Sequence, residues 1–237
     1  MSKIFIIKAG SAHPWIIEKH GDFEDWIIAS MDCCDDEIAI ADVTKGSALP
    51  RYSDLAGVII PGSHCNVTEQ LDWSQTIAAW IPGVLARHIP ILGICYGHQL
   101  LAHALGGRVA DNPNGLEIGT VNMQLTKEAT RDRLLSGLTD PMKIIASHRQ
   151  TVMELPDNAK VLATSEMDSH MVLVMADNAW GVQFHPEFNA AIVIEYIEFF
   201  RDKLIAEGKD PDKLIETSQD APEAAGILKR FYEIASD

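Results

Sequence analysis

The sequence contains few cysteines, no block of basic residues and no long apolar run. Its four cysteines, which include the adjacent pair Cys33 and Cys34, form neither a disulfide framework nor a zinc-binding pattern. The 19 lysines and arginines against 34 aspartates and glutamates give a formal net charge of −15, which argues against nucleic acid and anionic membranes as partners. No apolar run approaches the length of a membrane span. These absences predict a protein of the reducing cytoplasm, without a metal, membrane or nucleic-acid partner.

The sequence does contain enough apolar residues for a full α/β core, since 47% of its 237 residues are hydrophobic. Short apolar runs predict strands over 4–7, 38–43, 55–60 and 89–94. Helical patterns lie between them, over 15–28 with a break near Gly21 and over 71–87, where Pro82 is expected to kink the helix or end it early. Further short strands near 152, 161–163, 171–175 and 179–182 precede a helix over 190–204. Because strands and helices alternate, we expect a mostly parallel sheet flanked by helices.

Cys95 lies between the strand that ends at Ile94 and the helix that follows it. Gly93 and Gly97 flank the cysteine in the pattern Gly-x-Cys-x-Gly, which is typical of a nucleophile elbow because glycine permits close approach of the strand and the helix. The amino end of a helix favours an anion, so this position promotes the thiolate. A lone cysteine is more often a small buried hydrophobe. The two glycines favour a nucleophile here.

A nucleophilic cysteine needs a base, and the base needs an orienting group. Among nine histidines, His185 is the best candidate because it ends an apolar strand and Glu187 follows two residues later. The spacing allows Glu187 to accept a hydrogen bond from the imidazole. His-Pro-Glu alone is also an ordinary strand-ending turn, and the presence of the elbow favours the catalytic interpretation.

The segments 93–99 (Gly-Ile-Cys-Tyr-Gly-His-Gln) and 185–187 (His-Pro-Glu) together resemble the class I, or triad, glutamine amidotransferase family, and most closely the amidotransferase domain of GMP synthase. The resemblance runs over residues 50–205 and implies a flavodoxin-like three-layer fold. It implies that Cys95 attacks the side-chain amide of L-glutamine, that His185 moves the proton and that Glu187 orients His185. A γ-glutamyl thioester then forms, ammonia leaves and water releases glutamate, with no cofactor.

The same resemblance suggests where the oxyanion would be held. Residues 61–64 (Pro-Gly-Ser-His) follow the third strand, where the family has its glycine-rich oxyanion loop. We expect backbone N–H donors from Gly62 and Tyr96, although the sequence departs from the commoner Gly-Gly-Pro form. Gln99 is similar to the residue that helps to hold the substrate.

Two further segments resemble parts of the glutamine site. Glu117 either pairs with the substrate ammonium or is a surface carboxylate at the start of a strand. Ser147 and His148 correspond to residues that contact the α-carboxylate and amine, but Arg149 replaces a family glycine. The arginine either favours a substrate with an added carboxylate, such as a γ-glutamyl peptide, or points to solvent so that only its N–H is used.

The chain is predicted to consist of an amidotransferase domain at 1–205 and an acidic C-terminal extension at 206–237 that is helical and packs on the domain. No segment resembles a nucleotide-binding synthetase, so an ammonia acceptor is expected on another polypeptide. Three functions remain open. They are a glutaminase or amidotransferase acting on L-glutamine, a γ-glutamyl peptidase acting on γ-glutamyl dipeptides or glutathione-like substrates, and a non-catalytic, partner-binding relative.

Overall fold

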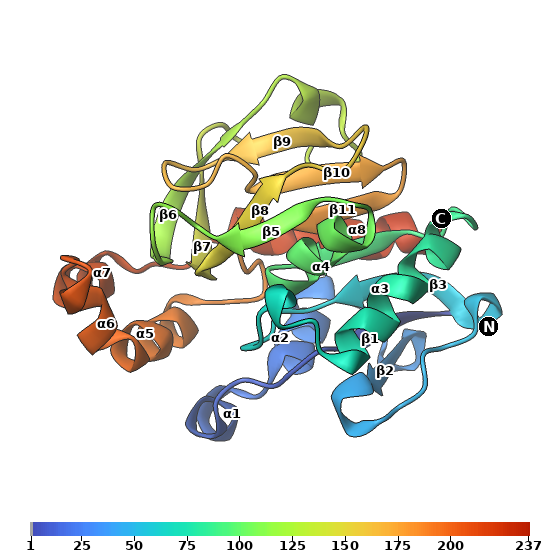
Figure 1. Ribbon diagram of the computed structural model, residues 1–237, viewed down its shortest axis with the longest axis horizontal. Coiled ribbons are helices and arrows are strands. Elements are labelled where there is room, and N and C mark those ends of the chain that lie inside the picture. The colour runs from blue at the N-terminus through green and yellow to red at the C-terminus, as the bar shows by residue number, and fades with distance from the viewer. Residues whose placement is uncertain (1) are drawn as a thin grey trace.

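The computed structural model describes residues 2–237 and has a central sheet between layers of helices (Figure 1). Within these residues, nine strands form one sheet in the order β2-β1-β3-β4-β11-β10-β9-β6-β7. The parallel half of the sheet contains β2 (Ile38–Asp42), β1 (Lys3–Lys8), β3 (Leu55–Ile60), β4 (Ile91–Ile94) and β11 (Ala179–Val182). The antiparallel half contains β10 (Val172–Ala176), β9 (Lys160–Thr164), β6 (Glu117–Leu125) and β7 (Met142–His148). A separate two-stranded sheet pairs β5 (Arg108–Asp111) with β8 (Gln150–Glu154).

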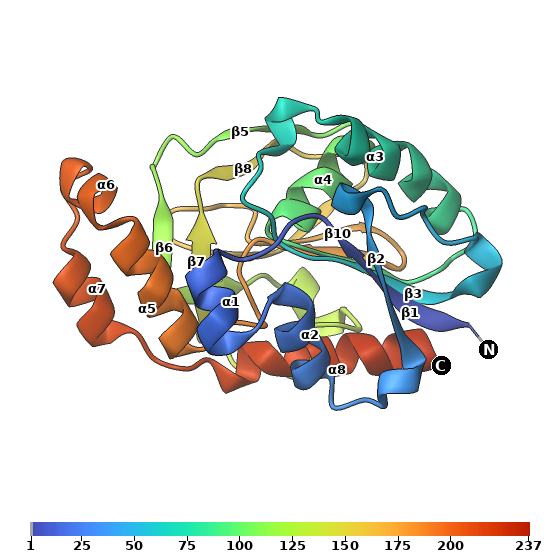
Figure 2. The same cartoon turned by 90° about the horizontal axis from the view of Figure 1, so that it is seen from below.

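Helices cover both faces of the parallel half, as Figure 2 shows. Side chains alternate along β1, so that Ile6 joins one core cluster and Ile7 joins the other. The first cluster includes buried residues of α2 (Phe23–Met31) and α8 (Pro222–Ser236). The second includes those of α3 (Asp72–Leu85) and α4 (Tyr96–Ala104). The predicted fold class, a three-layer α/β arrangement with helices on both faces of a central sheet, is confirmed, and the parallel strands form the half of the sheet that leads to Cys95.

The remaining helices lie at the amino terminus and beyond the sheet. They are α1 (Pro14–His20), α5 (Ala190–Phe199), α6 (Arg201–Ala206) and α7 (Pro211–Thr217). Short 3₁₀ turns occupy Asp35–Glu37, Val43–Lys45, Tyr52–Asp54, Val67–Glu69 and Glu128–Arg131. Among the described residues, no helix has both the length and the apolar character needed to cross a membrane.

Local signals explain the predicted break between α1 and α2. The carboxylate of Asp22 accepts hydrogen bonds from the N–H groups of Phe23 and Asp25, and the carboxylate of Asp25 accepts one from the N–H of Asp22. The reciprocal bonds between Asp22 and Asp25 form a capping box that satisfies N–H groups at the start of α2. The break near Gly21 is therefore confirmed.

Two helix predictions differ from the structure. The expectation that Pro82 ends its helix early is wrong, because α3 continues to Leu85. A proline removes only one hydrogen-bond donor, and the amphipathic face of α3 packs on both sides of it. The single helix predicted over 190–204 is also wrong. Phe200, with φ −92° and ψ 9°, separates α5 from α6, because this ψ departs from the helical repeat.

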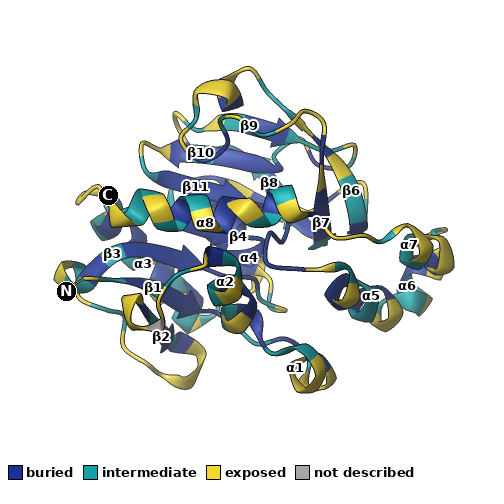
Figure 3. Cartoon of the chain, turned by 180° about the vertical axis from the view of Figure 1, so that it is seen from behind, coloured by how far each residue is buried: buried dark blue, intermediate teal, exposed yellow. Residues whose placement is uncertain are grey.

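The last helix belongs to the main core of the molecule. Ile227, Leu228 and Phe231 of α8 are buried, and the helix contacts α2, β3 and β7. Figure 3 shows buried and exposed residues alternating along it. Its apolar face is therefore covered within the chain, while the division at residue 205 stays a prediction.

Candidate active site

The elbow predicted around Cys95 is present between β4 and α4. Cys95 has φ 48° and ψ −96°, a strained conformation for a residue with a side chain. A Cβ atom added at Gly93 would lie 2.3 Å from the carbonyl oxygen of Gly97, and one added at Gly97 would lie 2.0 Å from that of Ile60. Both glycines are thus required by the close approach of the helix to the sheet, which aims the sulfur away from the strand.

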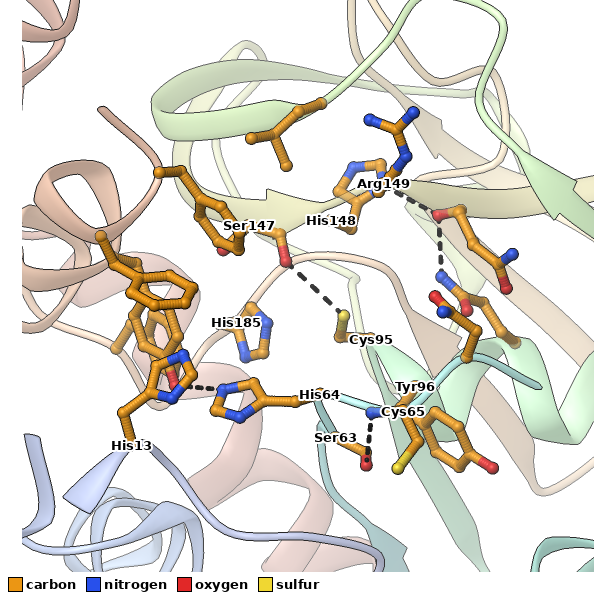
Figure 4. A pocket seen from close by; sticks show the side chains of 18 of the residues that line it. His13, Ser63, His64, Cys65, Cys95, Tyr96, Ser147, His148, Arg149 and His185 are labelled. Atoms are coloured by element: carbon orange, nitrogen blue, oxygen red, sulfur yellow. Dashed lines mark hydrogen bonds between the residues drawn. The ribbon is translucent and has the colours of Figure 1, made fainter. Parts of the chain in front are cut away.

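His185 reaches the same edge of the sheet from the neighbouring parallel strand. The register pairs Ile94 of β4 with Val182 of β11, and the N–H of Cys95 donates to the carbonyl of Val182 at 2.8 Å. The backbone N–H of His185 then donates to the carbonyl of Ile145 at 2.8 Å. Figure 4 shows the imidazole beside the sulfur of Cys95. The two residues, distant along the chain, meet because parallel strands end at a common edge.

Glu187 lies against Nδ1 of the His185 imidazole. Nδ1 of His185 lies 2.8 Å from Oε1 of Glu187, and both side chains are buried. Burial by itself lowers the pKa of His185, but the Glu187 carboxylate and the sulfur of Cys95 more than offset this and raise the pKa to about 10. The imidazole is therefore held as a cation beside the sulfur. Because Nδ1 is occupied by Glu187, Nε2 is the nitrogen that is left to exchange a proton near Cys95.

The two expected oxyanion donors, Gly62 and Tyr96, lie next to His185 and Cys95 respectively. Tyr96 is the first residue of α4, so its N–H has no acceptor within the helix. Its side chain is anchored in the core, where its hydroxyl lies 2.6 Å from that of Ser74. Gly62 lies against His185, since an added Cβ would be 2.9 Å from Cε1 of the imidazole. The assignment of both N–H groups to the oxyanion remains a prediction.

Gln99 and Ser147 line the cavity beside Cys95. The side-chain amide of Gln99 donates to the carbonyl of Gln150 at 2.8 Å and to the side-chain oxygen of Gln183 at 2.9 Å. Its N–H groups therefore hold the cavity wall together. The carbonyl of Ser147 faces the sulfur of Cys95 at 3.8 Å (Figure 4).

Glu117 lies behind the cavity wall. Its side chain is 2% exposed and pairs with Nε2 of His148 at 2.9 Å and with the hydroxyl of Ser165 at 2.8 Å. Residues 117 and 148 are direct partners in the β6–β7 ladder, which explains the contact. The surface alternative for Glu117 is wrong because the carboxylate is buried. His148 lines the cavity in its place.

Arg149 lies at the rim of the cavity, where it is half-exposed. Its guanidinium pairs with Asp111 at 3.4 Å and with Glu207 at 3.1 Å. Its carbonyl accepts a hydrogen bond from the N–H of Asn112 at 2.8 Å. The positive charge is thus already balanced by two carboxylates of the chain, which weakens the argument that Arg149 selects an acidic substrate.

The cavity above Cys95 has a volume of about 390 Å³ and extends past His185 onto a wall of aromatic rings. The sequence did not reveal this wall, because its members come from segments that are far apart along the chain. Among those that line the cavity are His13, His64, Phe188, Tyr196 and Phe199.

An elbow cysteine next to a buried His–Glu pair, at the carboxyl edge of a parallel sheet, is the arrangement of cysteine-nucleophile α/β proteins. Residues 16–199 match the family model described as "Glutamine amidotransferase class-I". The chain belongs to this family.

Its relatives differ in their named activities. "Gamma-glutamyl peptidase 4" of Arabidopsis thaliana is 34% identical over 189 residues, which cover 78% of this chain and 74% of that protein. One subunit of the glutamine-hydrolysing GMP synthase of Sulfolobus acidocaldarius is 32% identical over 146 residues, covering 61% of this chain and 74% of that protein. The crystal structure of a glutamine amidotransferase from Thermotoga maritima superimposes with a TM-score of 0.77 at 25% identity, covering 100% of this chain and 99% of that one.

Proposed function

We propose that the protein is a cysteine-dependent amidohydrolase that cleaves γ-glutamyl amide bonds. The observation that carries this proposal is the imidazole of His185, which is bound to Glu187 at 2.8 Å and faces the sulfur of Cys95. A buried cysteine beside an imidazole that is held by a carboxylate is an activated nucleophile with its own proton donor.

In the proposed reaction, Sγ of Cys95 attacks the carbonyl carbon of the γ-amide. The oxyanion accepts hydrogen bonds from the N–H groups of Gly62 and Tyr96. His185 passes its proton to the leaving nitrogen as the C–N bond breaks, and a γ-glutamyl thioester remains. His185 then takes a proton from water, the resulting hydroxide attacks the thioester, and glutamate leaves with the thiolate restored. Gln99, Ser147 and His148 form the side of the cavity that would hold the glutamyl part.

A γ-glutamyl peptide is the substrate that we favour. The cavity volume of about 390 Å³ falls within the range of roughly 300–1,000 Å³ for sites that bury small organic ligands. Its continuation past His185 offers space for a leaving group larger than ammonia. The similarity to the γ-glutamyl peptidase of Arabidopsis thaliana over 78% of the chain supports this choice.

The second candidate is hydrolysis of L-glutamine, with transfer of ammonia to a separate synthetase. The specific support is the similarity to the Sulfolobus acidocaldarius protein, which is named as one subunit of a glutamine-hydrolysing GMP synthase. Neither reaction requires a metal or an organic cofactor. A cytoplasmic location belongs to both proposals, because a reducing compartment keeps a nucleophilic thiol available.

The test is glutamate release by the purified protein from L-glutamine and, separately, from γ-Glu-Ala. We expect release from the dipeptide to be faster, and the Cys95→Ser variant to lose on the order of 10⁴-fold or more in kcat. Mass spectrometry of the quenched reaction should show the glutamyl adduct on the wild-type protein only. Faster release from glutamine would select the second candidate. No release from either compound would contradict both candidates and support a non-catalytic, partner-binding role.

A further inference from the structure

The position of the proton donor determines where the leaving group must lie, provided that the proposed hydrolysis holds. Nδ1 of His185 is bound to Glu187, so the leaving nitrogen must approach Nε2. Whatever is attached to that nitrogen therefore projects from Cys95 past His185. Figure 4 shows His185 between the sulfur of Cys95 and His13, whereas Arg149 lies on another side of the cavity.

The surface past His185 consists of stacked rings. Phe188 stacks on the imidazole of His185 with a centroid distance of 4.0 Å, and Tyr196 stacks on Phe188 at 5.4 Å. His64 lies 3.1 Å from the hydroxyl of Tyr196 through its Nε2, and its ring stacks on His13 at 4.1 Å. This wall is thus continuous from the proposed proton donor to the surface.

The outer end of the wall leaves large aromatic residues open to solvent. His13 stacks on Trp15 at 4.5 Å and contacts Phe199 at 4.2 Å. Phe199 is 48% exposed and lines the cavity, while Trp15 is 38% exposed. Exposed apolar side chains that border a cavity mark a binding surface more often than a random part of the surface does.

The wall carries no charge at neutral pH. Burial lowers the pKa of His64 to about 4, and the neighbouring His13 and His185 contribute to this lowering. Burial also lowers the pKa of His13 and raises that of Tyr196. Neutral rings favour contact with an aromatic or apolar group of the substrate, and they do not attract a carboxylate.

One cation lies near this wall. Lys203 of α6 lines the same cavity, and its Nζ lies 5.7 Å from the centroid of Phe200, whose ring contacts Phe199 at 4.9 Å. Among the described residues, the ammonium of Lys203 makes no direct ion pair, although its charge contributes to the lowering of the pKa of Asp111. Its charge is therefore less fully balanced within the chain than that of Arg149, which pairs directly with Asp111 and Glu207.

We propose that His13, His64, Tyr196 and Phe199 form a leaving-group subsite for an aromatic amino acid, so that the preferred substrates are γ-glutamyl dipeptides with an aromatic second residue. The aromatic side chain stacks on the wall, and the C-terminal carboxylate pairs with Lys203. This inference rests on the proposed hydrolysis and names the part of the substrate that the hydrolysis alone does not define.

The test compares kcat/KM for γ-Glu-Phe and γ-Glu-Gly, which share the scissile bond and the C-terminal carboxylate. We expect a ratio of roughly tenfold or more in favour of γ-Glu-Phe, the size of effect that one or two aromatic contacts produce. The ratio should fall several-fold in Phe199→Ala and in His13→Ala. Ile205→Ala is the matched control, because Ile205 is an exposed apolar residue of α6 outside the cavity lining.

Lys203 is tested with γ-glutamyl phenethylamide, which keeps the ring and lacks the carboxylate. Lys203→Met should lower kcat/KM for γ-Glu-Phe and leave that for the phenethylamide unchanged. Equal kcat/KM values for the two dipeptides in the wild-type protein would overturn the subsite while the proposed hydrolysis stands. No hydrolysis of either dipeptide would overturn the favoured γ-glutamyl peptidase function as well.

Discussion

Replacing Glu187 with glutamine tests how the charge beside His185 supports catalysis. The substitution keeps the size of the side chain and removes the negative charge that lies 2.8 Å from Nδ1. Because the Glu187 carboxylate is a main reason that the pKa of His185 rises to about 10, its loss must lower that pKa. An opposite charge at this range changes a pKa by about 1–3 units. The amide also offers a donor to Nδ1, which favours the wrong tautomer of the imidazole.

The direction in which the pH profile shifts follows from the role of protonated His185. Protonated His185 is needed to donate a proton to the leaving nitrogen, so activity falls as the pH rises through the pKa of His185. In the wild-type protein, we expect the alkaline limb of kcat/KM near pH 10. In Glu187→Gln, this limb should move down by about 1–3 pH units, and kcat should fall roughly 10²–10⁴-fold.

The assay is the pH dependence of kcat/KM for γ-Glu-Ala, together with the rate at which iodoacetamide alkylates Cys95. The alkylation reports the thiolate without any need for substrate binding. Glu198→Gln is the matched control, because this carboxylate pairs with Arg201 on the surface and the substitution makes the same chemical change outside the cavity. If the alkaline limb of kcat/KM does not move in Glu187→Gln, and kcat stays within about tenfold of the wild-type value, the role assigned to Glu187 is refuted.

Two further substitutions test the surroundings of the site. Gly62→Ala places a Cβ 2.9 Å from Cε1 of His185, so we expect kcat/KM to fall at least about tenfold through displacement of the imidazole. Its control, Gly226→Ala in α8, meets no atom within 4 Å and should raise the free energy of unfolding by about 0.5–1 kcal/mol in a denaturant titration. Glu117→Ala removes the hydrogen-bond partner of Nε2 of the buried His148, and should lower the free energy of unfolding by about 1–3 kcal/mol. A rise in KM at unchanged stability would show instead that Glu117 contacts substrate.

Much of the fold was accessible from the sequence because its signals act over a few residues. The strand runs and the α1–α2 break follow from local apolar patterns and from the capping box at Asp22. The early helix end expected at Pro82 and the single helix expected over 190–204 were wrong, because packing decides whether a helix tolerates a proline and where a helix breaks. The antiparallel half of the sheet was not specified, since the pairing partners of short strands lie far apart along the chain.

The sequence by itself determined the elbow. Gly93, Cys95 and Gly97 lie within one short segment, and the steric need for glycine at both positions is a local property of a strand that turns into a helix. It also determined the His185–Glu187 pair as a candidate, because only Pro186 separates the imidazole from the carboxylate along the chain.

Only the tertiary structure decided which other side chains share the cavity. The register of β6 with β7 buries Glu117 against His148, and the approach of β5 and Glu207 balances the charge of Arg149. The aromatic wall joins His13, His64 and Phe199 from three distant segments. Contacts of this kind depend on how the elements pack, and no periodicity or motif along the chain records them.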